Sequence, residues 1–173
     1  MSQARYLCGW FFAIAIACTL ALGGCSGYSP KKLQAGQTEA EVVQQMGPPT
    51  ARYALPGGGK RLEYARGPAG RETYMVDFDA GGRMTTWDQV LTLPNLYAIS
   101  PGMTQDEVLL RVGHPGTTFP IKRQQLVLWN YRYPTNDCLW FQISMGDDGK
   151  VITASQGTDP QCDAPSDARS DGR

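Results

Sequence analysis

The sequence GQTEAEVVQQMGPP, over residues 36–49, returns 66 residues later as GMTQDEVLLRVGHP, over residues 102–115. The two versions share Gly, Thr, Glu, Val, Gly and Pro at the same places. A pattern that recurs at a fixed distance indicates a structural unit that is built more than once. We therefore expect the chain to contain two copies of one small fold.

Each copy begins with the signature of a helix N-terminus. Thr38 and Thr104 are suitable N-cap residues, and Glu41 and Glu107 stand three positions after them. This spacing is that of a capping box, in which each of the two side chains accepts a hydrogen bond from the backbone N–H of the other residue. Both stretches are therefore predicted to start a helix at the residue after the threonine.

Each helix is expected to be short and to need a surface to lie on. In the first copy, Val42 and Met46 share one helical face, Gly47 supplies the left-handed C′ position, and Pro49 prevents continuation. A helix of about nine residues is not stable alone in water. The motif residues of the two copies are Gly36, Thr38, Glu41, Gly47 and Pro49, then Gly102, Thr104, Glu107, Gly113 and Pro115.

The surface is predicted to be a sheet. The segments after each helix alternate between apolar and polar residues, as strands with one buried face do; Tyr74, Val76 and Phe78 are an example. Strands are expected at residues 61–66, 72–79 and 83–90, and again at 126–133, 139–145 and 150–156. The predicted fold class is α+β, with two tandem repeats over residues 33–90 and 91–157. Each repeat would hold one or two short helices packed on a three-stranded antiparallel sheet.

Two features suggest that the copies touch. Residues 91–99, which join them, are too apolar for a free linker. The sheets are also rich in aromatic residues, and some of these must lie outside a single core. They either fill an interface between the copies or form an exposed protein-binding patch. The aromatic residues concerned are Trp87, Trp129, Tyr131, Tyr133, Trp140 and Phe141.

The N-terminus reads as an export signal. Arg5 is followed by an apolar run from Trp10 to Leu22, which is too short to span a bilayer. Leu22-Gly23-Gly24-Cys25 resembles a bacterial lipobox, whose cysteine is lipidated and becomes the new N-terminus. We therefore expect a signal peptide at residues 1–24 and a lipidated tether at residues 25–32. Ser26, rather than aspartate, after the cysteine favours the outer membrane, with the chain on its periplasmic face.

The cysteines fit an oxidising compartment. Once Cys8 and Cys18 leave with the signal and Cys25 carries lipid, Cys138 and Cys162 remain. We predict that these two form a disulfide, which would close a loop worth about 3.5 kcal/mol in the chain-entropy model. Residues 158–173 are rich in Asp, Ser and Pro, and they are predicted to form a polar, disordered tail.

Charge excludes one class of partner. The full chain has 16 basic and 16 acidic residues, and loss of Arg5 with the signal changes the net charge from 0 to −1. A nucleic-acid-binding protein needs a basic footprint, which this balance does not provide. The membrane, through the lipid, and a protein of the envelope are the expected partners.

No catalytic, metal or cofactor site is predicted. The single histidine, His114, stands between glycine and proline and is interpreted as a solvated turn residue. Pro56–Lys60 lacks the spacing of a phosphate-binding loop, and Asp77–Asp88 matches a calcium loop less well than a strand-turn-strand unit. The expected function is therefore non-enzymatic.

The repeated motif resembles a known family. Residues 33–42 (LQAGQTEAEV) and 99–108 (ISPGMTQDEV) are each similar to the opening of the SmpA/OmlA (BamE-like) outer-membrane lipoproteins. The resemblance implies a non-catalytic scaffold in the β-barrel assembly machinery, in contact with the barrel protein, another lipoprotein and anionic phospholipid. This chain has two copies where that family has one.

The doubled arrangement is also similar to the β-lactamase inhibitory proteins, which use a sheet face to block an enzyme. The sequence therefore leaves two functions open. The first is a BamE-like interaction module that serves outer-membrane protein assembly or envelope integrity. The second is an inhibitor or modulator of a periplasmic enzyme.

Overall fold

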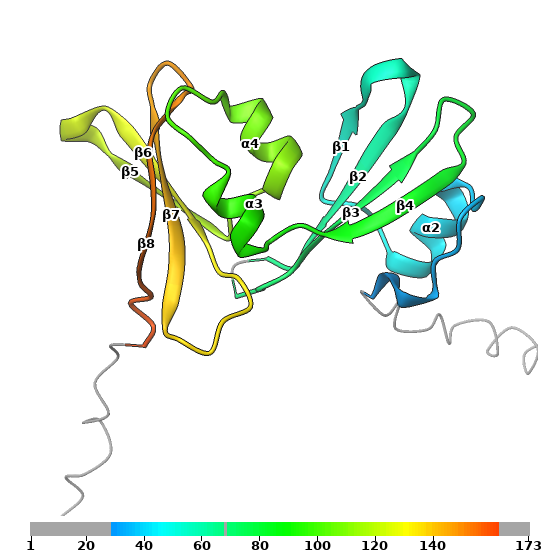
Figure 1. Ribbon diagram of the computed structural model, residues 1–173, viewed down its shortest axis with the longest axis horizontal. Helices are drawn as coiled ribbons and strands as arrows, with labels where there is room; N and C mark the ends of the chain where they lie inside the picture. Colours follow the sequence, from blue (N-terminus) through cyan, green and yellow to red (C-terminus); the bar gives the residue numbers. More distant parts are fainter. Residues whose placement is uncertain (1–28, 68, 163–173) are drawn as a thin grey trace, which may run out of the picture.

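The computed structural model describes residues 29–67 and 69–162 (Figure 1). The predicted signal peptide, the predicted lipidation site Cys25 and residues 163–173 of the predicted tail lie outside the described residues. Within the described part, no helix combines the length and the apolar character that a membrane span requires. The C-terminal end of the predicted tether is packed, because Pro30 is buried in a short 3₁₀ turn over Pro30–Lys32.

The first repeat is a helix followed by four strands. Helix α2 precedes strands β1 to β4, which pair in sequence order as an antiparallel sheet. One short 3₁₀ turn, η1, precedes α2, and another, η2, lies between β1 and β2. The elements are η1 (Pro30–Lys32), α2 (Glu39–Met46), β1 (Ala51–Ala54), η2 (Pro56–Gly58), β2 (Lys60–Ala65), β3 (Thr73–Phe78) and β4 (Met84–Gln89).

The second repeat has the same plan with one extra helix at its start. Strands β5 to β8 again pair in sequence order as an antiparallel sheet. The elements are α3 (Leu93–Tyr97), α4 (Gln105–Val112), β5 (Thr117–Ile121), η3 (Lys122–Gln124), β6 (Leu126–Tyr131), β7 (Leu139–Gly146) and β8 (Val151–Thr158).

The pairing registers fix which residues of the two repeats are equivalent. Ala51 pairs with Glu63 in the first sheet, and Thr117 pairs with Asn130 in the second. The offset is therefore 66 at β1 and β5, and 67 from β2 and β6 onward. The extra residue lies in the β5–β6 connection, where Gln125 adopts a positive φ of 53°. Even the bulges correspond, since the register shifts after Asp77 and after Ser144.

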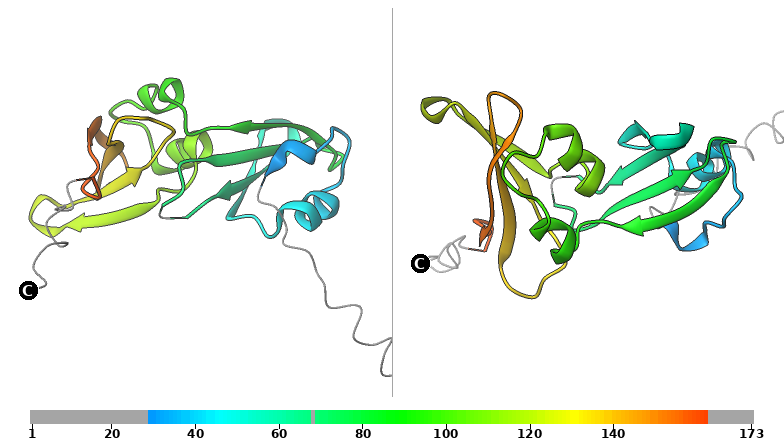
Figure 2. Two further views of the ribbon diagram at one scale, coloured as in Figure 1. Left: turned by 90° about the horizontal axis from the view of Figure 1, so that it is seen from below. Right: turned by 45° about the horizontal axis from the view of Figure 1, so that its top comes forward.

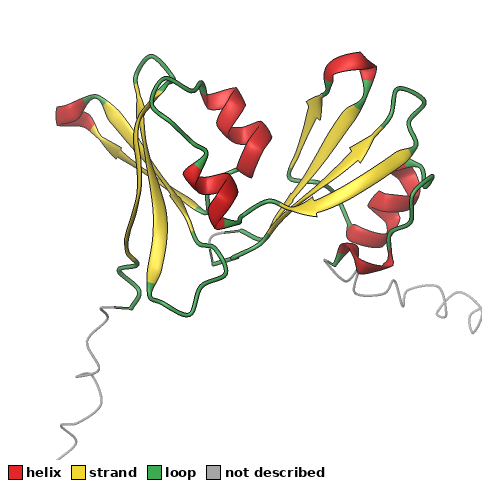
Figure 3. Ribbon diagram, in the orientation of Figure 1, coloured by secondary structure: helices red, strands yellow, loops and turns green. Residues whose placement is uncertain are grey.

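The fold class predicted from the sequence is wrong. Each sheet has four strands, not three, and the described part of the chain is mostly β, with three short α-helices (Figure 3). The missed strands are β1 and β5, which directly follow the helices. β1 has only four residues and no apolar alternation, and β5 contains Pro120. Proline is tolerated here because β5 is an edge strand, where one side of the backbone needs no partner.

Helices α2 and α4 both carry the capping box that their sequences predict. Thr38 Oγ1 accepts from Glu41 N at 3.4 Å, and Glu41 Oε2 accepts from Thr38 N at 2.7 Å. The second helix repeats these contacts at Thr104 and Glu107. In both repeats these hydrogen bonds, which come chiefly from the threonine backbone, hold the pKa of the glutamate below its ordinary value.

The glycines that end the helices differ in one respect from the expectation. Gly47 and Gly113 have positive φ angles of 85° and 78°, but their ψ angles are −174° and −168°. This conformation is extended rather than left-handed helical, so the chain leaves each helix in a straight line toward β1 or β5. Only glycine adopts such a backbone without strain.

Each repeat has its own hydrophobic core. In the first, Val42 and Met46 of α2 pack with one face of β2 to β4. In the second, Val108 and Val112 of α4 pack with one face of β6 to β8, and the joining segment contributes Leu91, Leu96 and Ile99. The main sheet residues are Leu62, Tyr64, Val76 and Phe78, then Trp129, Tyr131, Phe141, Ile143 and Met145; Tyr133 joins the second core from the segment after β6.

The two repeats stack with the same polarity. Helices α3 and α4 lie between the two sheets, and α2 lies on the far side of the first sheet (Figures 1 and 2). The order of layers is therefore the second sheet, α3 with α4, the first sheet, and α2. The first sheet is covered on both faces, whereas the second sheet is covered by helices on one.

Candidate functional site

The junction between the repeats is built around a buried carboxylate. Glu63 lies on β2, on the face of the first sheet that looks away from α2, and its exposed fraction is 0%. Met75 and Thr73, on the same face, are each 1% exposed. A buried carboxylate is stable only when hydrogen-bond donors surround it, so the neighbours of Glu63 must supply them.

Three donors from two elements reach this carboxylate. The backbone N–H of His114 donates to Glu63 Oε1 at 2.8 Å, and His114 Nδ1 lies 2.8 Å from Glu63 Oε2. The phenol of Tyr53, on β1, donates to the same Oε2 at 2.5 Å. Burial, and then the hydrogen bond to Glu63, raise the pKa of Tyr53 well above its ordinary value. Tyr53 therefore stays a neutral donor at any physiological pH.

These contacts indicate which ring nitrogen of His114 donates. A carboxylate only accepts hydrogen bonds, so Nδ1 of His114 must carry the proton. The side chain is 45% exposed, so it is half in solvent and half against the junction. The sequence-based interpretation of His114 as a solvated turn residue is therefore incomplete, because its ring and backbone both hold Glu63.

Gly113 allows this close approach. A Cβ atom added at Gly113 would lie 2.8 Å from Thr73 Cγ2 and 2.9 Å from Glu63 Cδ. The carbonyl oxygen of Gly113 also accepts a hydrogen bond from the buried Tyr131 hydroxyl at 2.9 Å. The glycine thus serves two purposes: it gives the backbone conformation that ends α4, and it lets the helix end touch the first sheet.

A second polar contact crosses the junction. Arg61, also on β2, donates from Nη1 to the carbonyl oxygen of Leu110 on α4 at 2.9 Å. The same guanidinium pairs with Asp77 on β3, with Nε 2.6 Å from Oδ1 and Nη2 2.7 Å from Oδ2. The carboxylate raises the pKa of Arg61, which burial opposes only in part. The charge of this arginine is therefore satisfied within the first sheet, while one of its donors orients α4.

The junction is better suited to positioning than to catalysis. A histidine oriented by a carboxylate can act as a general base, so this chemistry has to be considered. The cavity that adjoins His114 has a volume of only about 20 Å³. That volume corresponds to a single water molecule rather than a substrate. The hydrogen bonds among Tyr53, Glu63 and His114 join the two repeats.

A larger cleft opens along the junction between the end of β4 and α4. Its volume is about 620 Å³, and its charged lining residues are Arg61, Asp88, Glu107 and Arg111. These two positive and two negative groups give no field of one sign. Arg61 is already paired with Asp77, so the cleft offers no strong recognition of an anion or a cation.

The outer face of the second sheet carries an apolar surface. Phe119 on β5 is 61% exposed and Ile152 on β8 is 47% exposed. Leu128 on β6 is half-buried and stands next to Phe119, its partner across the strands. The polar residues beside them bond to each other: Gln142 Nε2 donates to Asn130 Oδ1 at 2.9 Å, and Asn130 Nδ2 donates to Thr117 Oγ1 at 3.2 Å. This surface, Phe119, Leu128, Asn130, Gln142 and Ile152, is called the open face below.

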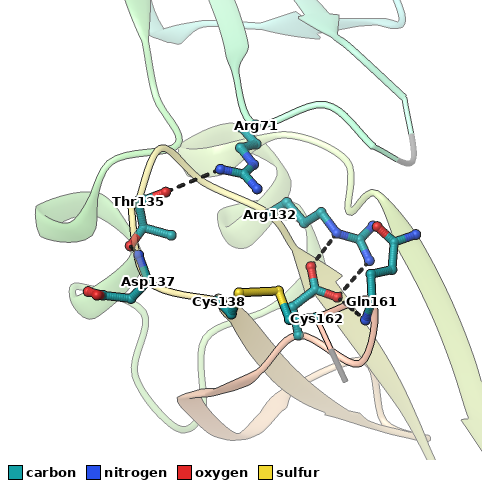
Figure 4. The surroundings of a disulfide bond; sticks show 8 residues. Arg71, Arg132, Thr135, Asp137, Cys138, Gln161 and Cys162 are labelled. Carbon is teal, nitrogen blue, oxygen red and sulfur yellow. Dashed lines mark hydrogen bonds and ion pairs between the residues drawn. A yellow bond between two sulfur atoms is a disulfide. The ribbon is translucent and has the colours of Figure 1, made fainter. Parts of the chain in front are cut away.

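The cysteines predicted to pair do so. A disulfide joins Cys138 and Cys162 with their Cα atoms 5.9 Å apart, where β7 begins and the chain leaves β8 (Figure 4). Asp159 lies inside the loop and accepts from Arg132 Nε at 2.5 Å and Nη2 at 2.9 Å. The guanidinium holds the pKa of Asp159 below its ordinary value. Arg71 of the first repeat also reaches this region, donating to the carbonyl oxygen of Thr135 at 3.1 Å.

The structure brings together only some of the residues that the sequence singled out. Gly113 lies at the junction, whereas Gly47 and Pro49 lie at the equivalent end of α2. Gly36 and Gly102 each have a φ of 89° and donate to the first residue of the last strand in their own repeat. Within the described residues, no group of three or more His, Cys, Asp or Glu side chains could hold a metal ion.

Sequence reasoning missed Tyr53, Glu63 and the role of His114. A usable signal was present in the alignment of the two copies. Glu63 is equivalent to Asn130, and His114 is equivalent to Pro48. The first repeat therefore has the glutamate without the histidine, and the second has the histidine without the glutamate. Positions at which two copies of a unit differ are candidates for the place where the copies meet.

Neither a protein-family model nor a curated protein matches the sequence. Among solved structures, similarity is found to a DUF4309 family protein from Bacillus subtilis. The identity is 11% and the TM-score 0.28, over 70% of this chain and 78% of the other. None of the comparisons identifies a family for this chain.

Two further solved structures are longer than the part they share with this chain. A cysteine-rich secretory protein from Staphylococcus aureus has 12% identity and a TM-score of 0.27, over 73% of this chain and 45% of its own. An extracellular protein with an SCP domain from Bacillus anthracis has 11% identity and a TM-score of 0.28, over 73% and 44%. None of the three is described as an SmpA/OmlA protein or a β-lactamase inhibitor, and similarity at this level supports no functional argument.

Proposed function

We propose that this protein is a periplasmic lipoprotein, anchored in the outer membrane through Cys25, that acts as a non-catalytic protein-interaction module. Its role is BamE-like, in outer-membrane protein assembly or envelope integrity. The lipobox and the resemblance of both repeats to SmpA/OmlA proteins motivate the proposal. The observation that carries it is the open face of the second sheet.

The open face has the properties of a docking surface. It combines an exposed aromatic residue and aliphatic side chains with polar groups that already satisfy one another. A partner that covers it would bury apolar area without leaving a buried polar group unpaired. The equivalent face of the first sheet, which carries Glu63, is covered by α4 within this same molecule. This surface of the fold is therefore suited to receiving a helix.

The tether adds to this role. Two or three acyl chains on Cys25 would make membrane attachment effectively permanent. A module that is confined to the membrane surface meets membrane partners at a raised effective concentration, so modest contacts suffice. The predicted lack of catalytic, metal and cofactor sites is consistent with a role that depends on surfaces alone.

Site-specific crosslinking in intact cells tests the proposal. A photo-reactive phenylalanine analogue at Phe119 places the probe on the open face, and the same analogue at Tyr97 is the matched control. Tyr97 is also an exposed aromatic residue, at 59%, but it lies on α3 and contacts Phe141 of the opposite sheet face. Recovery of a barrel-assembly component from the Phe119 position and not from Tyr97 supports the proposal.

Other outcomes contradict it. If Phe119 captures no envelope protein, the open face is not a docking surface. If it captures a periplasmic hydrolase whose activity falls on binding, the protein is an enzyme inhibitor or modulator instead. The anchor is tested separately: Cys25→Ala should move the protein from the outer-membrane fraction to another fraction, and unchanged fractionation would contradict lipid attachment at this residue.

A further inference from the structure

The contact between the repeats is a template for a contact between molecules. Helix α4 lies on the face of the first sheet that looks away from α2 (Figure 2). Along the helix, the charge of Asp106 acts on Tyr53, the carbonyl of Leu110 accepts from Arg61, and His114 contacts Glu63. Asp106 and Leu110 lie on α4 and His114 lies two residues after its end; spaced four apart, they mark the side of α4 that faces away from its own core.

The equivalent of this sheet face in the second repeat is the open face. The registers make Phe119 equivalent to Tyr53, Leu128 to Arg61, and Asn130 to Glu63. Phe119 is 61% exposed, whereas its equivalent Tyr53 is half-buried; Asn130 and Glu63 are both buried, at 7% and 0%. The described residues of this chain therefore use the binding face of one sheet and leave that of the other accessible.

The matching helix is also accessible. Helix α2 is the equivalent of α4, and its stripe opposite Val42 and Met46 consists of Ala40, Gln44 and the following Pro48. All three are exposed. Inside each molecule, α4 is docked on the first sheet. The equivalent helix, α2, and the equivalent sheet face, the open face, are both left undocked, and they lie at opposite ends of the stack of layers.

The two accessible surfaces match each other in charge. Where the internal contact joins Asp106, Leu110 and His114 to the first sheet, α2 presents the uncharged Ala40, Gln44 and Pro48. Where that sheet presents Arg61, Glu63 and Asp77, the second sheet presents the uncharged Leu128, Asn130 and Ser144. At these positions both sides of the proposed contact are therefore uncharged. Burying these surfaces against each other would leave no ionised group without a partner.

One position must be accommodated differently. Trp140 is equivalent to Thr73, which contacts Gly113 at the end of α4. The larger side chain of Trp140 would hold the C-terminal end of a docked α2 farther from β7 than α4 lies from β3. Gly47, the equivalent of Gly113, presents no side chain to this tryptophan.

We propose that α2 of a second copy of this chain docks on the open face, in the manner of α4 on the first sheet. The inference rests on the proposed function, in that both treat the open face as a binding surface. The contact is head-to-tail, since it joins two different surfaces. It therefore continues from copy to copy rather than closing as a symmetric dimer.

Analytical ultracentrifugation of the mature chain from Ser26 to Arg173 tests this proposal. This form retains every described residue and lacks only the signal and the lipidated cysteine. We expect a mass that increases with concentration and passes beyond the dimer. Two single variants, Phe119→Glu on the open face and Ala40→Glu on α2, should each remain monomeric, because each places an unpaired charge in the contact. Unchanged circular dichroism and urea midpoints show that both variants remain folded.

Mixing the two variants identifies a head-to-tail contact. The Phe119→Glu chain keeps an intact α2, and the Ala40→Glu chain keeps an intact open face. An equimolar mixture should therefore form a dimer of one chain of each kind and nothing larger. A symmetric contact between like surfaces would not be restored by mixing. A mixture that contains no dimer would therefore overturn the proposal.

Two further outcomes separate this inference from the proposed function. A wild-type chain that stays monomeric up to about 1 mM, the range that tethering reaches, overturns self-association. If Phe119 still captures a barrel-assembly component in cells, the proposed function stands without it. If Phe119 captures only a second copy of this chain, the self-association stands and the proposed function fails.

Discussion

Among single residues, His114 tests the junction most directly, because its ring is half-exposed while the carboxylate that it contacts is buried. His114→Ala removes the ring donor and leaves Glu63 with the backbone N–H and Tyr53. We expect a loss of about 1–3 kcal/mol in the free energy of unfolding, measured with urea, because a buried charged acceptor loses one partner.

The matched control is Gln44→Ala on α2, an exposed side chain on the helix equivalent to the one that His114 follows. A change within about 0.5 kcal/mol is expected there. Equal losses in the two variants would show that the contact between His114 and Glu63 does not stabilise the protein.

Asp159 gives a prediction about acid. The Arg132 guanidinium lowers the pKa of this carboxyl from its ordinary value of 3.8 in the folded chain. A depressed folded pKa stabilises the protein above the ordinary pKa, and this stabilisation is lost as the pH falls through the folded value. Asp159→Asn should therefore destabilise the protein at neutral pH by about 1–3 kcal/mol.

The pH dependence is the measurement that identifies the cause. The difference between wild type and Asp159→Asn in urea unfolding should be constant above about pH 5 and should shrink below about pH 4. A difference that stays constant down to the lowest accessible pH would mean that lost packing, and not the ion pair with Arg132, accounts for the effect.

Single residues also show where prediction from the sequence succeeds. Thr38 and Glu41 could be assigned because a capping box involves residues only three positions apart, so the sequence contains the whole contact. His114 and Glu63 are 51 positions apart. Nothing local in either segment indicates which sheet face the helix of the second repeat will meet. Glu63 alternates with apolar neighbours, as a solvent-facing strand residue also does.

Among the elements, the ends of α2 and α4 form a natural comparison. Gly47 and Gly113 have similar positive φ angles, but only Gly113 lies against the other repeat. Gly47→Ala should cost about 1 kcal/mol from backbone strain alone. Gly113→Ala should cost about 1–3 kcal/mol more, because the new methyl group meets Thr73 and Glu63.

Urea unfolding of both variants measures this difference, and the crosslinking or proteolysis of the junction shows where the damage lies. If the two glycine substitutions cost the same, the close approach of Gly113 to the first sheet does not matter to stability.

The elements were predicted better in kind than in number, because each sheet has one strand more than expected. Helices α2 and α4 and the last three strands of each sheet follow from local patterns that the sequence repeats. β1 and β5 were missed because they are edge strands with little apolar character, and one contains Pro120. An edge strand pairs on one side only, so its sequence carries few of the features that identify strands.

At the level of the whole molecule, the two repeats should differ in their ability to fold alone. The first sheet is covered on one face by α2 and on the other by α4, whereas the second sheet relies on α3 and α4, which belong to its own repeat. Separation would expose Glu63 and Met75 in the first repeat. In the second, it would mainly expose polar atoms of α4.

We therefore expect residues 91–162 to give a cooperative unfolding transition when expressed alone. Residues 29–90 alone should be poorly folded or should aggregate. Circular dichroism with urea, and light scattering, compare the two fragments at equal concentration. If the first repeat alone were as stable as the second, coverage by α4 would be unimportant to it.

The stacking of the repeats could not be predicted from the sequence. The apolar joining segment and the abundant aromatic residues both indicated contact between the copies. Most of those aromatic residues instead lie within the cores of their own repeats, as Trp129 and Tyr131 do. An aromatic residue that does contact the other repeat is Tyr53, from the edge strand that was missed. Patterns within a repeat report its own core, and they do not report which outer face meets the neighbour.

The strand order also has a consequence for how the chain folds. Every strand pairs with its neighbour in sequence, so each sheet can form by successive hairpins with short loops. Such local pairing is kinetically fast, whereas the contact between Glu63 and His114 must close a loop of 51 residues. During synthesis, the first sheet therefore exists for a time with its second face uncovered. That interval is when the chain is most open to chaperones and to premature association.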